Sequence, residues 1–341
     1  MPGGSGPAAA EPLAPLLSVR GLTVTFPGPD GERVSVVDGA SFDVARGEIV
    51  ALVGESGSGK SVTALALLDL VPEPGLVEAG EVVFEGRDVR ALAEPEKRRL
   101  RGGGIGLVFQ EPGAALDPVR RIGDEVAAVV RRHRGLGRRE AREEAVRWLA
   151  RVALPEPERR MEDWPHRMSG GMRQRAMVAL ALAGGPRLLV ADEPTTALDV
   201  TIQAQLLALL RRLRDELSLT VLLITHDLGV VAELAERVVV MYAGEIVEEA
   251  PVGDLFRRPA HPYTRALLAA RPGRPGAAKG HLPAIDGSIP EPGRRPAGCA
   301  FSPRCREALP RCSRARPALL PLPERRGRAA CFLWEEREEE P

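Results

Sequence analysis

The sequence predicts an α/β fold with a mostly parallel β-sheet at its core, and three observations carry this prediction. Segments 188–191 and 219–225 are apolar almost throughout, as strands buried on both faces of a parallel sheet are. Segment 200–217 between them has helical periodicity, so the order is strand, helix, strand. A further strand-like run, 48–53, leads into a glycine-rich loop and a helix start.

Smaller elements are expected around this sheet. Residues 18–26 and 34–44 alternate apolar and polar side chains, as half-buried strands do, and 80–84 is a further short strand. Residues 118–160 are highly charged and carry apolar side chains at three- and four-residue spacing. That spacing predicts helices over this region.

The two ends of the chain differ in composition from the centre. Residues 1–17 are rich in Gly, Ala and Pro and lack a basic or sustained apolar stretch, which indicates a disordered tail rather than a signal peptide. Residues 271–295 combine Pro, Gly and charge, and we expect them to form a linker. All four cysteines lie beyond this linker, from Cys299 onward.

Length and charge exclude some classes of function. The 341 residues suffice for one large domain with an appendage. Lys+Arg and Asp+Glu both number 47, so nothing attracts the whole molecule to nucleic acid, and we expect no nucleic-acid partner. No apolar run reaches the roughly 18–20 residues needed to cross a bilayer. We therefore expect a soluble, cytoplasmic protein that acts at a membrane only through partners.

Residues 54–61 match the pattern G-x-x-x-x-G-K-[ST] directly after a predicted strand. The backbone N–H groups of such a loop converge on phosphate, and the following helix adds positive charge at its N-terminus. The expected binding residues are Gly54, Glu55, Ser56, Gly57, Ser58, Gly59, Lys60 and Ser61. Lys60 is expected to reach the β- and γ-phosphates of a nucleoside triphosphate, and the Ser61 hydroxyl to bind Mg²⁺.

Two further segments carry residues suited to phosphate chemistry. Asp192 and Glu193 end the apolar strand at 188–191, where Asp192 can hold Mg²⁺ and Glu193 can polarise an attacking water. Ser169, Gly170 and Gly171 form a turn before a helix, which Ser169 can cap and which can bind an anion. A plain capped helix is the alternative for this turn.

Together with the phosphate loop, these segments resemble the ATP-binding cassette (ABC) transporter ATPases over residues 18–255. Gln110 resembles the family's Q-loop glutamine, Ser169 to Met172 the signature LSGGQ, and Asp192 with Glu193 the Walker B pair. Asp199 in Ala197-Leu198-Asp199 resembles the D-loop, and His226 the switch histidine. The order of these segments along the chain is also that of the family.

The resemblance implies a fold and a mechanism. The expected cassette has a mostly parallel sheet, an antiparallel β subdomain and a helical subdomain at about 113–185. Two cassettes would dimerise head to tail, so that Ser169, Gly170, Gly171 and Met172 bind the ATP of the partner subunit. Glu193 would orient water and His226 would stabilise the γ-phosphate, whereas Gln110 would contact Mg²⁺ and couple to a membrane subunit.

Three positions qualify this resemblance. Phe26 lies where the family has an aromatic residue that stacks on adenine, with a strand-end core residue as the alternative. Met168 and Met172 replace the Leu and Gln of the signature. Because backbone N–H groups and Ser169 would bind the phosphate, we expect these replacements to have modest effects.

The region 256–341 narrows the family further. Residues 256–268 and 298–305 are similar to the extension of oligopeptide/dipeptide importer ATPases. The resemblance implies an ATPase subunit at the cytoplasmic face of the membrane. Its partners would be a second ABC ATPase (usually a paralogue), two transmembrane permeases and an extracytoplasmic solute-binding protein. Uptake of nickel or another small solute is the alternative, followed by a non-transport ABC ATPase.

The four cysteines, Cys299, Cys305, Cys312 and Cys331, suggest a metal site because disulfides are disfavoured in the cytosol. Their spacing lacks the C-x₂-C pairs typical of structural zinc. Four thiolates on irregular loops can hold a [4Fe–4S] cluster, which is the preferred interpretation. Zinc and cysteines packed as small apolar residues stay as alternatives.

Overall fold

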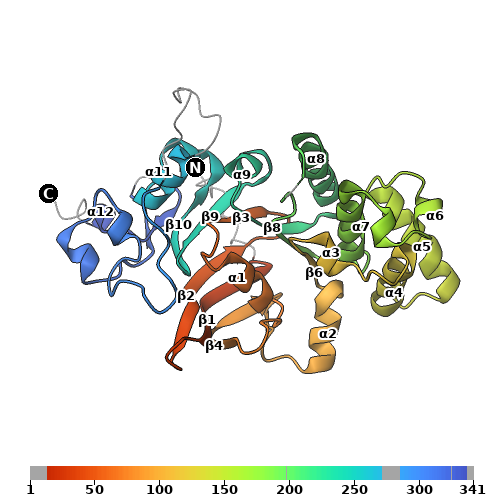
Figure 1. Ribbon diagram of the computed structural model, residues 1–341, viewed down its shortest axis with the longest axis horizontal. Coiled ribbons are helices and arrows are strands. Elements are labelled where there is room, and N and C mark those ends of the chain that lie inside the picture. The colour runs from red at the N-terminus through yellow and green to blue at the C-terminus, as the bar shows by residue number, and fades with distance from the viewer. Residues whose placement is uncertain (1–13, 197, 271–284, 324, 336–341) are drawn as a thin grey trace, which may run out of the picture.

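The structure, a computed structural model, describes residues 14–335 except 197, 271–284 and 324. Its long axis runs from the C-terminal extension at one end to a group of helices at the other, with the sheets between them (Figure 1). Most of the expected N-terminal tail and the first part of the expected linker lie outside the described residues.

The central sheet has eight strands in the order β11-β12-β10-β9-β3-β8-β7-β6. Its parallel part consists of β9 (Arg237–Tyr242), β3 (Ile49–Val53), β8 (Thr220–Thr225), β7 (Leu188–Asp192) and β6 (Ile105–Val108). Every residue of β3 and β8 is buried, which agrees with their apolar sequences. The expected parallel core is therefore confirmed.

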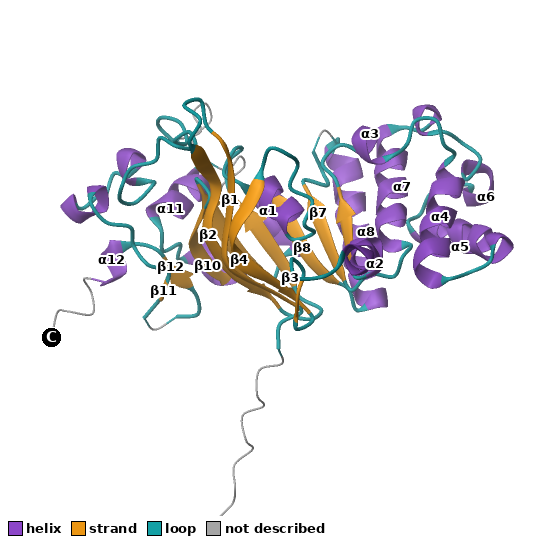
Figure 2. Cartoon of the chain, turned by 90° about the horizontal axis from the view of Figure 1, so that it is seen from below, coloured by secondary structure: helices purple, strands orange, loops and turns teal. Residues whose placement is uncertain are grey.

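A second, antiparallel sheet has the order β2-β1-β4-β5. It consists of β1 (Leu17–Pro27), β2 (Arg33–Val44), β4 (Leu76–Phe84) and the two-residue β5 (Arg87–Asp88). Figure 2 shows this sheet in front of the central one. Leu16 and Leu17 are fully buried here, and the Leu16 N–H donates to the Val44 carbonyl. The core of the protein thus includes residues before 18, because these two side chains are part of it.

Helices surround the central sheet. In chain order the first eight are α1 (Lys60–Ala66), α2 (Glu94–Gly103), α3 (Pro112–Ala115), α4 (Ile122–Arg134), α5 (Arg138–Arg151), α6 (Pro157–Arg160), α7 (Gly170–Leu182) and α8 (Val200–Leu217). A short 3₁₀ helix, η1 (Pro165–Arg167), precedes α7, and α9 (Leu228–Leu234) follows β8. Helices α4, α5 and α6 form the end opposite the extension in both views.

The C-terminal extension is built onto the edge of the central sheet. Its strands β11 (Leu320–Pro321) and β12 (Arg328–Ala329) continue the sheet from β10 (Glu245–Pro251), with antiparallel pairing. Its helices are α10 (Val252–Arg257), α11 (Pro262–Ala269), η2 (Ser302–Arg304), η3 (Pro310–Ser313) and α12 (Phe332–Glu335). Ile285 and Ile289, in the second part of the expected linker, pack on the core, so this part is folded onto the cassette.

The core has a separate cluster where the extension meets the sheet. Tyr263 of α11 and Phe301 belong to this cluster together with Ala51 and Val53 of β3. The extension therefore shares its core with the strand that leads into the phosphate loop.

None of the helices that the structure describes is long and apolar enough to cross a membrane.

Candidate nucleotide-binding site

The phosphate loop connects the end of β3 to the start of α1, as the sequence predicts. Gly54 must lack a side chain, since a Cβ there would lie 2.2 Å from the Met241 carbonyl oxygen of neighbouring β9. Gly57 and Gly59 have φ values of 81° and 104°, in the left-handed region that favours glycine. Of the three serines, Ser58 is buried, whereas Ser56 and Ser61 are exposed.

Lys60 is the first residue of α1, and its side chain folds back under the loop. Its Nζ donates to the carbonyl oxygens of Gly54 and Glu55 at 2.8 and 2.9 Å. The residue is 4 % exposed, and burial lowers the pKa of the ammonium despite the nearby charges of Glu193 and Asp192. The cation is thus held at the loop by two backbone carbonyls, where phosphate oxygens would meet it.

Asp192 ends β7 beside Lys60 and Ser61. Burial raises the pKa of its carboxyl group, and a hydrogen bond with Ser61 partly opposes this effect. Its Oδ1 atom is buried and has no hydrogen-bond partner. A buried carboxylate oxygen without a partner, next to a serine hydroxyl, fits the oxygen ligands that Mg²⁺ prefers.

Glu193 lies at the centre of a small polar network. The Gln110 Nε2 and Thr196 Oγ1 atoms donate to its Oε2 at 3.2 and 2.9 Å, and the His226 Nδ1 lies 3.0 Å from its Oε1. Burial acts to raise the pKa of Glu193, but the hydrogen bonds from His226 and Thr196 prevail and the pKa is lowered. Glu193 also has a φ of 46°, rare for a residue with a side chain and common at functional sites.

Three of the predicted residues therefore meet in one network: Gln110, Glu193 and His226. Gln110 contacts Glu193 directly, and its expected contact with Mg²⁺ stays a prediction. Thr196 was not anticipated from the sequence. The available signal was that Thr196 follows Glu193 by three residues. A turn between them brings the Thr196 hydroxyl to the Glu193 carboxylate.

The signature residues lie elsewhere, at the start of α7. Ser169 caps this helix by accepting a hydrogen bond from the Met172 N–H, so its predicted capping role is confirmed. A Cβ on Gly170 would meet no atom within 4 Å, whereas one on Gly171 would lie 3.1 Å from the Ile202 side chain of α8. Met168 is buried in the core cluster that includes the apolar side chains of α7. Met172 is partly buried and packs against that cluster. Both methionines thus serve as apolar packing residues.

Gln174 connects the signature helix to the site, whereas Asp199 caps the neighbouring helix α8. The Gln174 side chain of α7 is buried and donates to the Pro194 carbonyl oxygen at 2.6 Å, directly after Glu193. Asp199 caps α8 by accepting from the Ile202 N–H at 2.9 Å. Gln174 is not among the residues expected from the sequence, although a glutamine on an otherwise apolar helix face was a usable signal.

Phe26, the expected adenine platform, is half-buried near the end of β1. It packs on the core cluster that contains the buried side chains of the antiparallel sheet, and lies so close to Gly75 that a Cβ there would be 2.6 Å from its ring. This packing agrees with the alternative role of a strand-end core residue. Stacking on adenine stays a prediction.

The extension also contacts the phosphate loop, at Glu55. The Tyr263 hydroxyl accepts a hydrogen bond from the Glu55 N–H at 2.9 Å. Arg304 donates to both carboxylate oxygens of Glu55, at 2.9 and 3.2 Å. These two residues were missed by sequence reasoning, because they follow the loop by 208 and 249 positions.

The four cysteines line one small apolar pocket together with Phe301 and Phe332. Burial raises the pKa of the Cys299 and Cys331 thiols to about 11, and also raises that of Cys305. The space between the side chains measures about 10 Å³, enough for about one water molecule. No group of three or more His, Cys, Asp or Glu residues in the described ranges is placed to hold a metal ion. The geometry therefore gives the expected cluster no support.

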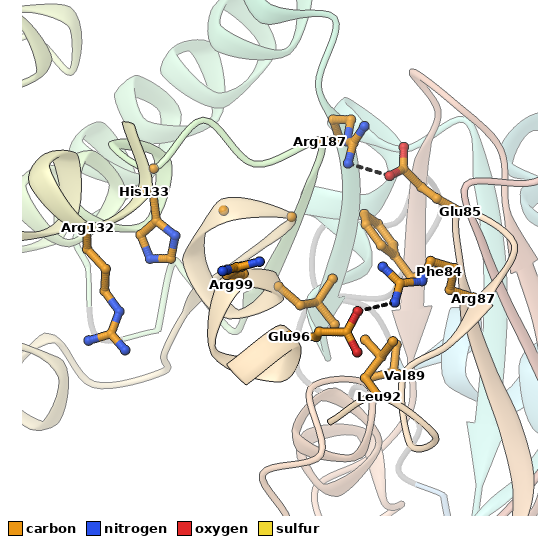
Figure 3. Close-up of a pocket in the computed structure, with 14 residues that line it drawn as sticks. Phe84, Glu85, Arg87, Val89, Leu92, Glu96, Arg99, Arg132, His133 and Arg187 are labelled. Atoms are coloured by element: carbon orange, nitrogen blue, oxygen red, sulfur yellow. Dashed lines mark hydrogen bonds and ion pairs between the residues drawn. The ribbon is translucent and has the colours of Figure 1, made fainter. Parts of the chain in front are cut away.

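A larger hollow of about 500 Å³ is lined by Phe84, α2 and the C-terminal end of α4. Figure 3 shows the ion pairs Arg187–Glu85 and Arg87–Glu96 in its wall. Gly103 and Gly104 line it just before β6 begins, whereas the phosphate loop follows the end of β3. Since these strands are part of one parallel sheet, the hollow and the loop lie at opposite strand ends and form separate sites.

A phosphate loop beside a carboxylate pair at the ends of parallel strands defines a P-loop nucleotide-binding cassette. Residues 37–196 match the family described as ABC transporter, and residues 247–312 match the oligopeptide/dipeptide transporter C-terminal region. A Brucella abortus protein is 51% identical over 306 residues, covering 90% of this chain and 92% of the relative. A Brucella ovis protein is 48% identical over 334 residues, covering 94% and 98%. Both names include the words "peptide import ATP-binding protein".

Solved structures agree with this relationship. An ATP-binding cassette in a dimeric post-hydrolysis state with ADP and Pi has a TM-score of 0.62 and 30% identity, covering 69% of this chain and 98% of that chain. A subunit of an ABC transporter complex from Clostridium perfringens has a TM-score of 0.60 and 25% identity, covering 72% and 91%. The chain belongs to the ATP-binding proteins of the ABC transporter family.

Proposed function

We propose that this protein is the ATP-hydrolysing subunit of an ABC importer that powers the uptake of oligopeptides or dipeptides. The observation that carries the proposal is the combination of two features in one chain. The first is the network of Glu193, Gln110 and His226 beside Lys60 and Asp192. The second is an extension that matches the C-terminal region of oligopeptide/dipeptide transporters.

Each residue of the site has a defined task in this proposal. The loop N–H groups and Lys60 bind the phosphates, and Asp192, Ser61 and Gln110 would hold Mg²⁺. When bound, Mg²⁺ neutralises charge on the phosphate oxygens. Glu193 accepts a proton from the attacking water, for which its lowered pKa keeps it ionised. His226 donates to the γ-phosphate while its Nδ1 stays near Glu193.

Ser169, Gly170, Gly171 and Met172 take part in a second site, on another cassette. They offer the N-terminus of α7 to the ATP of the partner subunit, and Asp199 lies near that contact at the start of α8. The other partners are two permeases and a solute-binding protein, with this subunit at the cytoplasmic face of the membrane. The names of the Brucella relatives and the matching extension support peptide as the cargo.

Co-purification tests this proposal. Native membranes are solubilised in mild detergent, and the tagged full-length protein is captured and analysed by mass spectrometry. Two multi-span permeases, a second cassette and a solute-binding protein that binds peptides are expected. If the solute-binding protein instead binds nickel or another small solute, that solute rather than peptide is the cargo. Capture with ribosomes or DNA would reject the import function.

For the cysteine pocket we propose a [4Fe–4S] cluster, with zinc or packed thiols as the alternatives. The proposal rests on the presence of four thiols around one pocket, which as described do not form a metal-binding group. Binding requires that the thiols lose protons and move apart, given their raised pKa values and the small space between them. Metal and sulfide analysis after anaerobic purification tests this proposal. Iron with sulfide supports the cluster, and a colourless protein without iron rejects it.

A further inference from the structure

We propose that the C-terminal extension positions the phosphate loop for nucleotide, by means of Arg304 and Tyr263, which hold Glu55. Glu55 is the second residue of the loop, and its carboxylate points to the extension rather than to the nucleotide site. Arg304 and Tyr263 are positioning residues in this proposal. It rests on the role of Lys60 as a phosphate ligand.

Every hydrogen-bonding group of Glu55 is engaged. Its carboxylate accepts two hydrogen bonds from Arg304, and its N–H donates to the Tyr263 hydroxyl. Its carbonyl oxygen accepts from the Lys60 Nζ at 2.9 Å. Glu55 thus connects two residues of the extension to the cation of the phosphate site. A displacement of Glu55 would remove one of the two carbonyls that hold Lys60.

The Arg304 side chain, which binds the Glu55 carboxylate, is itself held in place by other contacts. Its side chain is only 5% exposed, and it also donates to the carbonyl oxygens of Ile285 and Asp286 at 3.2 and 2.8 Å. Its guanidinium lies 5.8 Å from the centre of the Tyr242 ring. A planar guanidinium that binds a carboxylate through two parallel hydrogen bonds defines both distance and orientation.

Tyr263 provides the second fixed point. Its ring lies 4.6 Å from that of Tyr242 and 5.4 Å from that of Phe301, in the core cluster shared with β3. The hydroxyl is therefore held where it meets the Glu55 N–H. Because the loop has three glycines of its own, including two in left-handed conformations, external contacts of this kind reduce the conformations that it samples.

The pocket of the four cysteines adjoins this contact, since Cys305 follows Arg304 directly. Phe301 and Ser302, which begin the turn that carries Arg304, line the same pocket. The pocket and the Arg304 side chain are therefore carried by the same turn.

A binding experiment on the full-length protein tests the proposal. The dissociation constant of a fluorescent ATP analogue is measured with Mg²⁺ for Arg304→Gln, Glu55→Gln, the double variant and Arg304→Lys. Each Gln variant should weaken binding about tenfold, as expected for loss of a charge-assisted hydrogen bond. The double variant should be little weaker than either single one, because both remove the same contact. Arg304→Lys should lie between Arg304→Gln and the wild type.

Controls separate positioning from loss of fold and from failure of the assigned site. Arg306→Gln removes an exposed ion pair with Asp286 in the same segment and should bind as the wild type does. Tyr263→Phe keeps the packed ring and removes only the hydroxyl, so it tests the proposal even where Arg304→Gln does not fold. Folding is checked by the melting temperature without nucleotide.

The outcomes are distinct. Unchanged affinity in folded Arg304→Gln and Tyr263→Phe would overturn the positioning role, as would additive losses in the double variant. Lys60→Ala serves as the reference for the site itself. If Lys60→Ala binds the analogue as tightly as the wild type, the assignment of the phosphate site is wrong; if only Lys60→Ala loses binding, the site stands without help from the extension.

Discussion

Glu193 combines a lowered pKa, three side-chain neighbours and a left-handed backbone conformation. The backbone conformation turns the chain after β7, so that Asp192 and Glu193 face different parts of the site. The neighbours then orient the carboxylate and keep it ionised at neutral pH. Such a group can accept a proton from water only if it is aligned before the reaction, which these contacts provide.

Glu193→Gln should retain ATP binding and lower hydrolysis at least 100-fold, since the amide has nearly the same shape but cannot accept the proton. ATP binding and phosphate release by the purified protein measure the two effects. Glu94→Gln, on the exposed face of α2, is the matched control and should hydrolyse ATP at the normal rate. Unchanged hydrolysis in Glu193→Gln would contradict the assignment.

Glu125, in the first turn of α4, should make stability depend on pH. Burial raises its pKa to about 7 from the usual 4.5. The folded protein therefore binds this proton more tightly than the unfolded chain. The contribution to stability is complete below about pH 4.5 and is lost as the pH rises through about 7, by up to about 3 kcal/mol.

Glu125→Gln removes this loss and can still accept the hydrogen bond from the Asp117 N–H. We expect the variant to melt at a higher temperature than the wild type at pH 8 and at a similar temperature near pH 5. Glu143→Gln, exposed on α5, should follow the wild type at both values. Parallel melting curves of Glu125→Gln and wild type at all pH values would refute the prediction.

At the scale of elements, the extension is part of the cassette rather than a separate unit. Strand β12 pairs with β10, and Arg328 of β12 forms an ion pair with Glu249 of β10. Phe301 is 2% exposed and packs against both Tyr242 and Tyr263. Loss of packing in the extension should therefore reach the central sheet.

Phe301→Ala should lower the free energy of unfolding of the whole protein by about 3 kcal/mol, as a buried Phe→Ala substitution does. Chemical denaturation measures it. Leu320→Ala, at an apolar position in the same extension that is 43% exposed, is the control and should cost much less. If the extension unfolded alone at low denaturant and the cassette kept its stability, the shared core would be disproved.

At the scale of the whole molecule, the residues of the proposed mechanism occupy two separate surfaces. The phosphate loop lies at the centre of the molecule, whereas the signature turn begins α7 at the helical end (Figure 1). Ser169 bonds to its own helix. This separation is what a head-to-tail pair of cassettes requires, because each signature then binds the nucleotide of the other subunit.

Gly170→Asp should leave ATP binding by the isolated subunit unchanged, since a side chain there meets no atom within 4 Å. In the assembled transporter it should lower the ATPase rate at least tenfold, because a carboxylate would face the partner's triphosphate. ATPase assays of the co-purified complex, and binding assays of the subunit alone, check the two parts. A normal rate in the complex would remove the signature from the proposed mechanism.

Much of this fold could be predicted from the sequence, because short runs of adjacent residues encode its elements. The phosphate loop, the strand ending in Asp192 and the helix over 200–217 are each encoded by adjacent residues, and their predicted positions are confirmed. The resemblance to the ABC ATPases was likewise carried by short segments in a set order. The tail boundary was less accurate, since Leu16 and Leu17 belong to the core.

Contacts between distant segments depended on the tertiary structure. Nothing near Glu55 indicates that its carboxylate faces Arg304, which follows 249 positions later. The same holds for the buried Oδ1 of Asp192 and for the sharing of β3 between the cassette and the extension. A local pattern constrains backbone conformation and the buried face, whereas a long-range pair forms only when the packed sheets bring both residues to one point.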